Sequence, residues 1–129
     1  MSHHKKIKQF EDMPVWHDSQ DYAVAIYKIT KMYPEEEKYA LVDQMRRSAS
    51  SVSANIAEGF GRKSETHKET SRFYKIALGS LLETKNFIYL SKKLGYISPE
   101  DEKELIAQTE IVHDQITAIL KYFKNNPPN

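Results

Sequence analysis

Histidine and carboxylate side chains at helical spacing are what metal chemistry in a helical protein requires. Glu110 and His113 lie three residues apart, so both would project from one side of a helix. Di-iron bundles place such a Glu-x-x-His pair on each of two helices and add further glutamates. The chain has no second pair at this spacing, and it has no cysteine that could supply a thiolate. We therefore expect no metal site and no cofactor.

Basic side chains concentrate in the middle of the chain, where they could bind phosphate. Residues 46–75 hold seven Lys and Arg residues against three Glu residues, although the formal net charge of the whole chain is only +1. A local excess of this size attracts anions. An ordinary solvated surface is the alternative. The candidates for nucleic-acid binding are Arg46, Arg62, Lys63, Lys68, Arg72 and Lys75.

The motifs that mark an enzyme are missing. Gly59-Phe60-Gly61 does not follow a strand, so it is not a phosphate cradle of the dinucleotide-binding type. It does lead towards a helix start beside Arg62 and Lys63, which is a weak signal for an anion. No serine lies in a nucleophile elbow and no arrangement resembles a catalytic triad. We expect no catalytic residues.

A polar stripe follows one side of the second expected helix. Its members fall within a sector roughly 80° wide at 100° per residue. Our hypothesis is a half-buried hydrogen-bond network in which Arg47 pairs with Glu58 or with Glu83 of the next helix. Such networks specify register and partner choice, and a solvated face is the alternative. The residues assigned to this network are Gln44, Arg47, Ser51, Asn55, Glu58 and Glu83.

Four helices must position these residues. Apolar side chains recur at helical spacing, and the few Gly and Pro residues fall between the periodic segments. Gly59 and Gly95 are expected left-handed helix ends, and Ser98-Pro99 is a helix start. The expected helices span residues 14–33, 35–58, 64–94 and 99–124, with an N-terminal arm at 1–12 and a polar tail at 125–129.

Length and composition suit one small domain that comprises residues 1–129. Short loops between long helices predict an all-α, antiparallel, up-down-up-down four-helix bundle. No apolar run approaches the roughly 20 residues that a membrane-spanning helix needs, and no secretory signal is recognisable. We therefore expect a cytoplasmic protein that does not bind membranes.

The third helix is apolar on two sides. One side was assigned to the bundle core: Phe73, Ile76, Ala77, Ser80, Thr84, Phe87, Ile88, Ser91 and Leu94. The second side points roughly 120° away. A helix that is apolar on two faces needs a second partner, so we assigned this side to contacts between subunits; a neighbouring helix or the N-terminal arm could also cover it. The interface candidates are Tyr74, Leu78, Leu81, Leu82 and Tyr89.

Several segments resemble the 23S rRNA intervening-sequence proteins. The most specific run from Gln44 to Ser48 and from Ser51 to Arg62, and shorter matches occur at Val15-Trp16, Phe73, Ile76 to Ser80, Glu83 and Leu94 to Ile97. Together they span about residues 10 to 120. Ser48 departs from the alanine that is more usual in the family, which puts nothing important in doubt.

The resemblance implies an antiparallel four-helix bundle that assembles as a ring-like homopentamer. Some members of the family are encoded inside insertions in bacterial large-subunit rRNA genes. A similar bundle, the accessory protein of diversity-generating retroelements, works with a reverse transcriptase and binds nucleic acid. Most members have no established biochemical role.

Two functions remain open at this point. The first is a non-enzymatic oligomeric scaffold that binds structured RNA or DNA, or a protein that handles nucleic acid, through the basic segment. The second is a protein–protein adaptor without nucleic-acid binding, in which the polar stripe and exposed tyrosines contact a partner.

Overall fold

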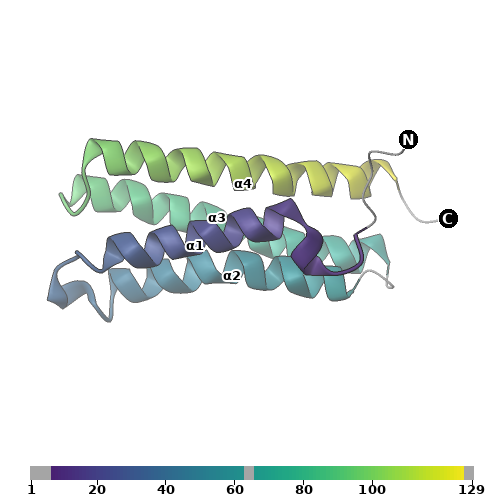
Figure 1. Ribbon diagram of the computed structural model, residues 1–129, viewed down its shortest axis with the longest axis horizontal. Helices are drawn as coiled ribbons and strands as arrows, with labels where there is room; N and C mark the ends of the chain where they lie inside the picture. The colour runs from purple at the N-terminus through teal and green to yellow at the C-terminus, as the bar shows by residue number, and fades with distance from the viewer. Residues whose placement is uncertain (1–6, 63–65, 127–129) are drawn as a thin grey trace.

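Four long helices dominate the computed structural model, which describes residues 7–62 and 66–126. They lie side by side along the long axis of the molecule (Figure 1). No strand occurs in the described residues, which confirms the prediction of an all-α fold with four helices. Lys63, residues 1–6 of the expected arm and residues 127–129 of the expected tail lie outside the described ranges. The elements are 3-10 turns at Phe10–Asp12 and Glu35–Glu37, and helices α1 (Pro14–Thr30), α2 (Leu41–Gly61), α3 (His67–Lys93) and α4 (Pro99–Asn125).

Consecutive helices run in opposite directions (Figure 1). On α1 and α2, Gln20 bonds to Ser53 and Thr30 bonds to Arg46, so later residues of one helix meet earlier residues of the other. Within the described ranges each helix packs against two neighbours and not against its diagonal partner. The four helices therefore enclose one continuous core, and none of them is long and apolar enough to cross a membrane.

The core side of α3 differs from the expected one. Tyr74 and Leu81, which we had assigned to a subunit interface, are 3% and 0% exposed and lie in the core of the chain itself. Ile76 and Leu94, expected in the core, are exposed. Apart from Ser71, which is also buried, the buried positions alternate in steps of four and three, the heptad pattern of helices packed at a shallow angle. They are Thr70, Tyr74, Ala77, Leu81, Thr84, Ile88 and Ser91.

Hydroxyl groups occupy part of this core side. Thr84 is fully buried, yet its hydroxyl donates to the carbonyl oxygen of Ser80 at 2.9 Å and lies 2.7 Å from the hydroxyl of Ser48 on α2. Across the bundle, the hydroxyls of Tyr22 and Thr109 lie 2.8 Å apart and join α1 to α4. Because each polar group has a partner, its burial costs little. The core side of α3 is therefore less apolar than its flanks suggest.

Two of the expected helix boundaries are confirmed. Gly95 ends α3 with φ +80°, a conformation that favours glycine. Ser98 caps α4: its hydroxyl accepts from the backbone N–H of Asp101, whose carboxylate accepts from the backbone N–H of Ser98. Thr66 likewise caps α3 by accepting from the N–H of Glu69.

The expected ends at residues 33, 35 and 58 are wrong. Pro34 disfavours helical geometry in the residue before it, and the last turn tightens so that the N–H of Tyr33 bonds to the carbonyl of Thr30. The acidic residues Glu35–Glu37 form a separate 3-10 turn, and α2 begins only at Leu41. It then continues past Gly59 to Gly61.

Gly59 is a packing residue and not the left-handed helix end that we expected. It is buried inside α2, and a Cβ atom placed on it would lie 3.1 Å from the ring of Tyr74 and 3.2 Å from Cβ of Phe73. At these distances the ring of Tyr74 or Cβ of Phe73 would have to move by a few tenths of an ångström to admit a methyl group. The absence of one brings α3 against α2 and seats Tyr74 in the core.

Replacing Gly59 with alanine tests this contact. A helical Gly→Ala change gains about 1 kcal/mol of helix propensity, whereas overpacking a core costs about 1–3 kcal/mol. We expect Gly59→Ala to lower the free energy of unfolding by about 1 kcal/mol. Gly79→Ala is the matched control on α3, since nothing lies within 4 Å of its added Cβ, and it should stabilise by about 0.5–1 kcal/mol. Urea denaturation measures both, and equal effects would contradict the packing role.

A second contact joins the two turns at one end of the bundle. The hydroxyl of Tyr96, after α3, donates to Oε2 of Glu37, before α2, at 2.7 Å. This hydrogen bond, together with partial desolvation, raises the pKa of Tyr96 to about 12. Since an unfolded tyrosine has a pKa of about 10, the bond stabilises the fold below pH 10 and is lost as the pH rises towards 12.

The Tyr96→Phe variant tests that contact. We expect its urea midpoint to fall below that of the wild type at pH 8, and the difference to shrink steadily from pH 10 upwards because the wild type then loses the same bond. Tyr39→Phe serves as control, since Tyr39 is 86% exposed. A difference that stays constant up to pH 11.5 would refute the assignment.

Candidate nucleic-acid interface

A basic groove of about 790 Å³ lies between the start of α3 and the end of α4. Lys68 and Lys75 come from α3, and Lys121 and Lys124 come from α4. Of the described residues that line the groove, none is acidic. Because no carboxylate of the described chain lines the groove beside these four lysines, ion pairs within the lining do not reduce their positive potential. The other lining residues are His67, Ser71, Leu120, Phe123 and Asn125.

Helix direction and spacing build the two walls. Lys68, Ser71 and Lys75 follow one another at three and four residues, so they share one side of α3. Since α4 runs in the opposite direction, its last turns lie beside the first turns of α3 (Figure 1). The N-terminus of α3 adds a partial positive charge to the same place.

Aromatic rings form the floor of the groove. The ring centroids of His67 and Phe123 lie 5.0 Å apart, and those of Tyr74 and Phe123 lie 5.8 Å apart. Burial raises the pKa of Tyr74 to about 12, so this phenol stays neutral at ordinary pH. Phe123 is half-buried and rests on the core. The floor is therefore held by the packing of α2, α3 and α4.

Two arginines of the basic segment, Arg62 and Arg72, lie close to another ring, that of Phe73. The guanidinium groups of Arg62 and Arg72 are 5.4 Å and 5.3 Å from the ring centroid of Phe73. Each also pairs with a carboxylate of its own helix, Arg62 with Glu58 at 3.0 Å and Arg72 with Glu69 at 3.9 Å. These arginines belong to the same end of the bundle as the groove but carry less uncompensated charge than its lysines.

Arg46 does not belong with the other basic candidates. It lies at the opposite end of α2, 16 residues before Arg62 and so about 24 Å away along the helix. Its guanidinium donates to Thr30 Oγ1 at 3.0 Å and to the Tyr27 carbonyl at 3.2 Å, and it stacks on the Tyr27 ring. This side chain joins α1 to α2, which corrects its assignment to the basic site.

Lys121 and Lys124 were not among the predicted site residues. The basic segment is one stretch of chain, whereas the groove joins two stretches about 50 residues apart. The signal that could have found them is the run Lys121-Tyr122-Phe123-Lys124, in which two lysines flank two aromatic residues and so combine positive charge with rings on which a base can stack.

The polar stripe of α2 is only partly a network. Asn55 donates to the hydroxyl of Ser51 at 2.9 Å, and Ser51 lies 3.0 Å from Ser80 of α3, which we had not included. Arg47 instead pairs with Asp43 at 3.0 Å on the surface. The expected partner Glu58 is 11 residues away, about 16 Å along the helix. Gln44 and Glu83 are exposed.

Three of the five interface candidates on α3 are not buried in the core of the chain. Leu82 and Tyr89 are 44% and 43% exposed, and Leu78 is half-buried. They lie on the side of α3 that faces α4, because Lys85 between them pairs with Glu110 of α4. Leu82 and Tyr89 remain available to another chain.

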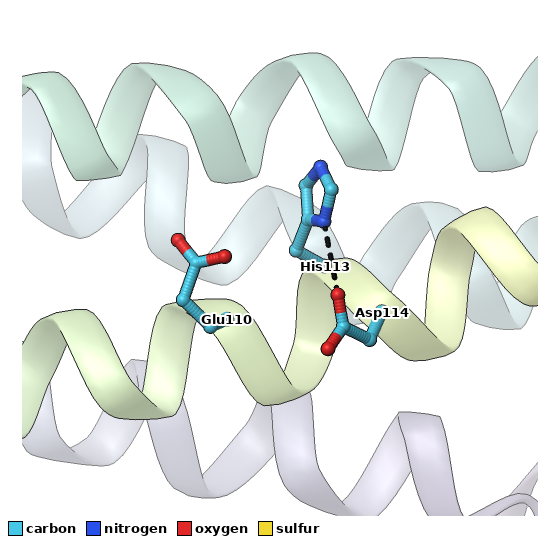
Figure 2. A group of neighbouring side chains, drawn as sticks. All are labelled: Glu110, His113 and Asp114. Atoms are coloured by element: carbon cyan, nitrogen blue, oxygen red, sulfur yellow. Dashed lines mark hydrogen bonds and ion pairs between the residues drawn. The ribbon is translucent and has the colours of Figure 1, made fainter.

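One group of possible metal ligands occurs in the described part of the chain: Glu110, His113 and Asp114 of α4 (Figure 2). The carboxylate of Glu110 is already paired with Lys85 at 2.6 Å, which raises the pKa of the lysine. His113 Nδ1 lies 3.4 Å from Asp114. The group therefore offers one imidazole, one carboxylate that is already paired with a lysine, and one exposed carboxylate. Such an arrangement is typical of ion pairs on a protein surface. We retain the expectation that the chain has no metal site.

The chain is similar to known proteins in sequence and fold. No curated protein matches it. A crystal structure of a protein with unknown function from the S23 ribosomal protein family, from Bacteroides thetaiotaomicron, is 25% identical and has a TM-score of 0.74, over 83% of this chain and 95% of that one. Residues 11–118 match the 23S rRNA-intervening sequence protein family, as the resemblance predicted. The chain therefore belongs to the 23S rRNA-intervening sequence protein family.

Proposed function

We propose that this protein is a non-enzymatic, cytoplasmic scaffold that binds the phosphate backbone of RNA or DNA through the basic end of its bundle. The groove between α3 and α4 carries the proposal, because four lysines line it and none of its described lining residues is acidic. Lysine ammonium groups recognise phosphate as point charges and need no precise geometry. The name of the family, which refers to 23S rRNA, agrees with such a ligand.

Assembly of several chains would raise a modest affinity. Each chain supplies one groove, and grooves held together bind one long polyanion with an increased effective concentration. We propose a homo-oligomer, a pentamer by resemblance, with Leu82 and Tyr89 of α3 in the interface and Leu78 beneath them. Tyr74 and Leu81 have no place in it, since both are buried within one chain.

A protein–protein adaptor is the second candidate, and another groove favours it. This groove, of about 740 Å³, lies between α1 and α2. Its α1 side presents Val24 and Tyr27, 49% and 43% exposed, and its α2 side is lined by small residues that permit close approach: Ser50, Ser53, Ala54 and Ala57. A partner from the native host whose binding is lost in Ala54→Arg, without any RNA binding, would favour the adaptor.

Binding of a structured RNA hairpin at low and moderate salt tests the main proposal. We expect a log–log salt slope of about −3 for each groove engaged, because each neutralised phosphate contributes about −0.7 to −0.9. Lys75→Glu with Lys121→Glu should weaken binding at least tenfold and reduce the slope by about two. The control is Lys28→Glu with Lys31→Glu, which changes the net charge by the same amount. Because both lysines lie at the C-terminal end of α1, far from the groove, these substitutions should have little effect on RNA binding. Absence of binding even at low salt would remove the proposal.

The oligomeric interface has its own test. We expect Leu82→Glu with Tyr89→Glu to lower the mass measured by light scattering from that of an oligomer to that of the 15.0 kDa chain, because a charge buried between chains without a partner is costly. Met32→Glu is the control, since Met32 is 83% exposed in the turn after α1. A wild-type protein that is monomeric throughout the micromolar range would contradict the assembly.

A further inference from the structure

We propose that the groove between α3 and α4 recognises single-stranded nucleic acid by holding one unpaired base against the rings of His67 and Phe123, while its lysines contact the adjoining phosphates. This inference rests on the function proposed above and names the form of nucleic acid that the site accepts.

The floor of the groove suits a base better than a phosphate. His67, Leu120 and Phe123 line it, and two of the three carry π faces. Stacking on an aromatic face tolerates any base, because every base has a π face of its own. A phosphate alone would gain nothing from Leu120 and Phe123, which offer only apolar surface.

The rings are held in place before a ligand arrives. Phe123 contacts His67 on one side and Tyr74 on the other, with centroids 5.0 Å and 5.8 Å away. Nδ1 of His67 is buried without a hydrogen-bond partner among the described residues, so one edge of the imidazole is packed against protein. A platform that is already ordered loses little entropy on binding.

The lysines stand around this floor on both helices. Lys68 and Lys75 are seven residues apart on α3, about 10 Å along its axis, and Lys121 and Lys124 oppose them from α4. A strand that placed one base on the rings would therefore have positive charge on either side for its phosphates. The groove volume of about 790 Å³ lies in the range of small-ligand sites, about 300–1,000 Å³.

Duplex nucleic acid does not fit this arrangement. Bases in a duplex are stacked on one another and offer only their edges in the grooves. The rings of His67 and Phe123 are half-buried, whereas the four lysines of the groove are exposed. A duplex could therefore reach the lysines but not stack a base on the rings. The site should therefore distinguish single strands from duplexes and from phosphate chains that carry no bases.

Fluorescence anisotropy with three probes of equal charge tests the proposal: a single-stranded oligouridylate, a blunt RNA duplex and an abasic sugar–phosphate chain. We expect the oligouridylate to bind about tenfold more tightly than the abasic chain at equal salt, the effect of one stacked base. Phe123→Leu keeps apolar volume on the core but removes the ring, and it should abolish this preference, as should His67→Ala. Tyr39→Leu, at the far end of the bundle, should leave the preference intact.

The outcomes separate this inference from the proposed function. If all three probes bind equally and Phe123→Leu changes none of them, stacking is wrong, although a loss of binding in Lys75→Glu with Lys121→Glu would still support phosphate binding. Tighter binding of the duplex also overturns the inference. If no probe binds at low salt, both proposals fail. Circular-dichroism melting of each variant confirms that it is folded.

Discussion

The close contact of α2 with α3 at Gly59 positions everything at the basic end of the molecule. Because Gly59 has no side chain, the ring of Tyr74 lies directly against α2 and is buried. Tyr74 in turn contacts Phe123 of α4, and Phe123 contacts His67 at the start of α3. Three rings thus lie in series from the contact at Gly59 to the floor of the groove. Protein interiors are close-packed, so a change at the first contact is transmitted to the last.

The number of helices and some of their ends could be predicted from the sequence, because they depend on local chemistry. Ser98 and Gly95 act on the backbone within a few residues, and they act there as expected. The core side of α3 could be predicted only in part. Thr84 and Ser91 were expected in the core and are buried, whereas Tyr74 and Leu81 were assigned to a subunit interface, because a helix that is apolar on two sides does not itself show which side its neighbours cover. A ranking by apolarity favours Ile76 and Leu94, which the structure leaves exposed.

Two of the four lysines of the groove were predicted from the sequence. Residues of the basic segment near the start of α3, such as Lys68 and Lys75, could be recognised because they are close in the sequence. That Lys121 and Lys124 lie opposite them could not be recognised in this way, since their proximity depends on the direction of α4 and on the turn that joins it to α3. The assignment of Arg46 to the basic site was wrong for the opposite reason. Arg46 belongs to the basic segment in sequence, but a straight helix separates it from Arg62 by about 24 Å.

The low net charge of the chain is compatible with a basic site because the charges are grouped locally. Away from the groove, acidic and basic residues are mixed: the acidic cluster Glu35–Glu37 is followed by Lys38, and Glu100–Glu102 is followed by Lys103. In the groove, the direction of α3 and α4 brings four lysines together, and none of its described lining residues is acidic. A polyanion responds to the potential at the site that it contacts and not to the total of +1. The local grouping of charge, and not its sum, is therefore the property that would suit this groove to nucleic acid.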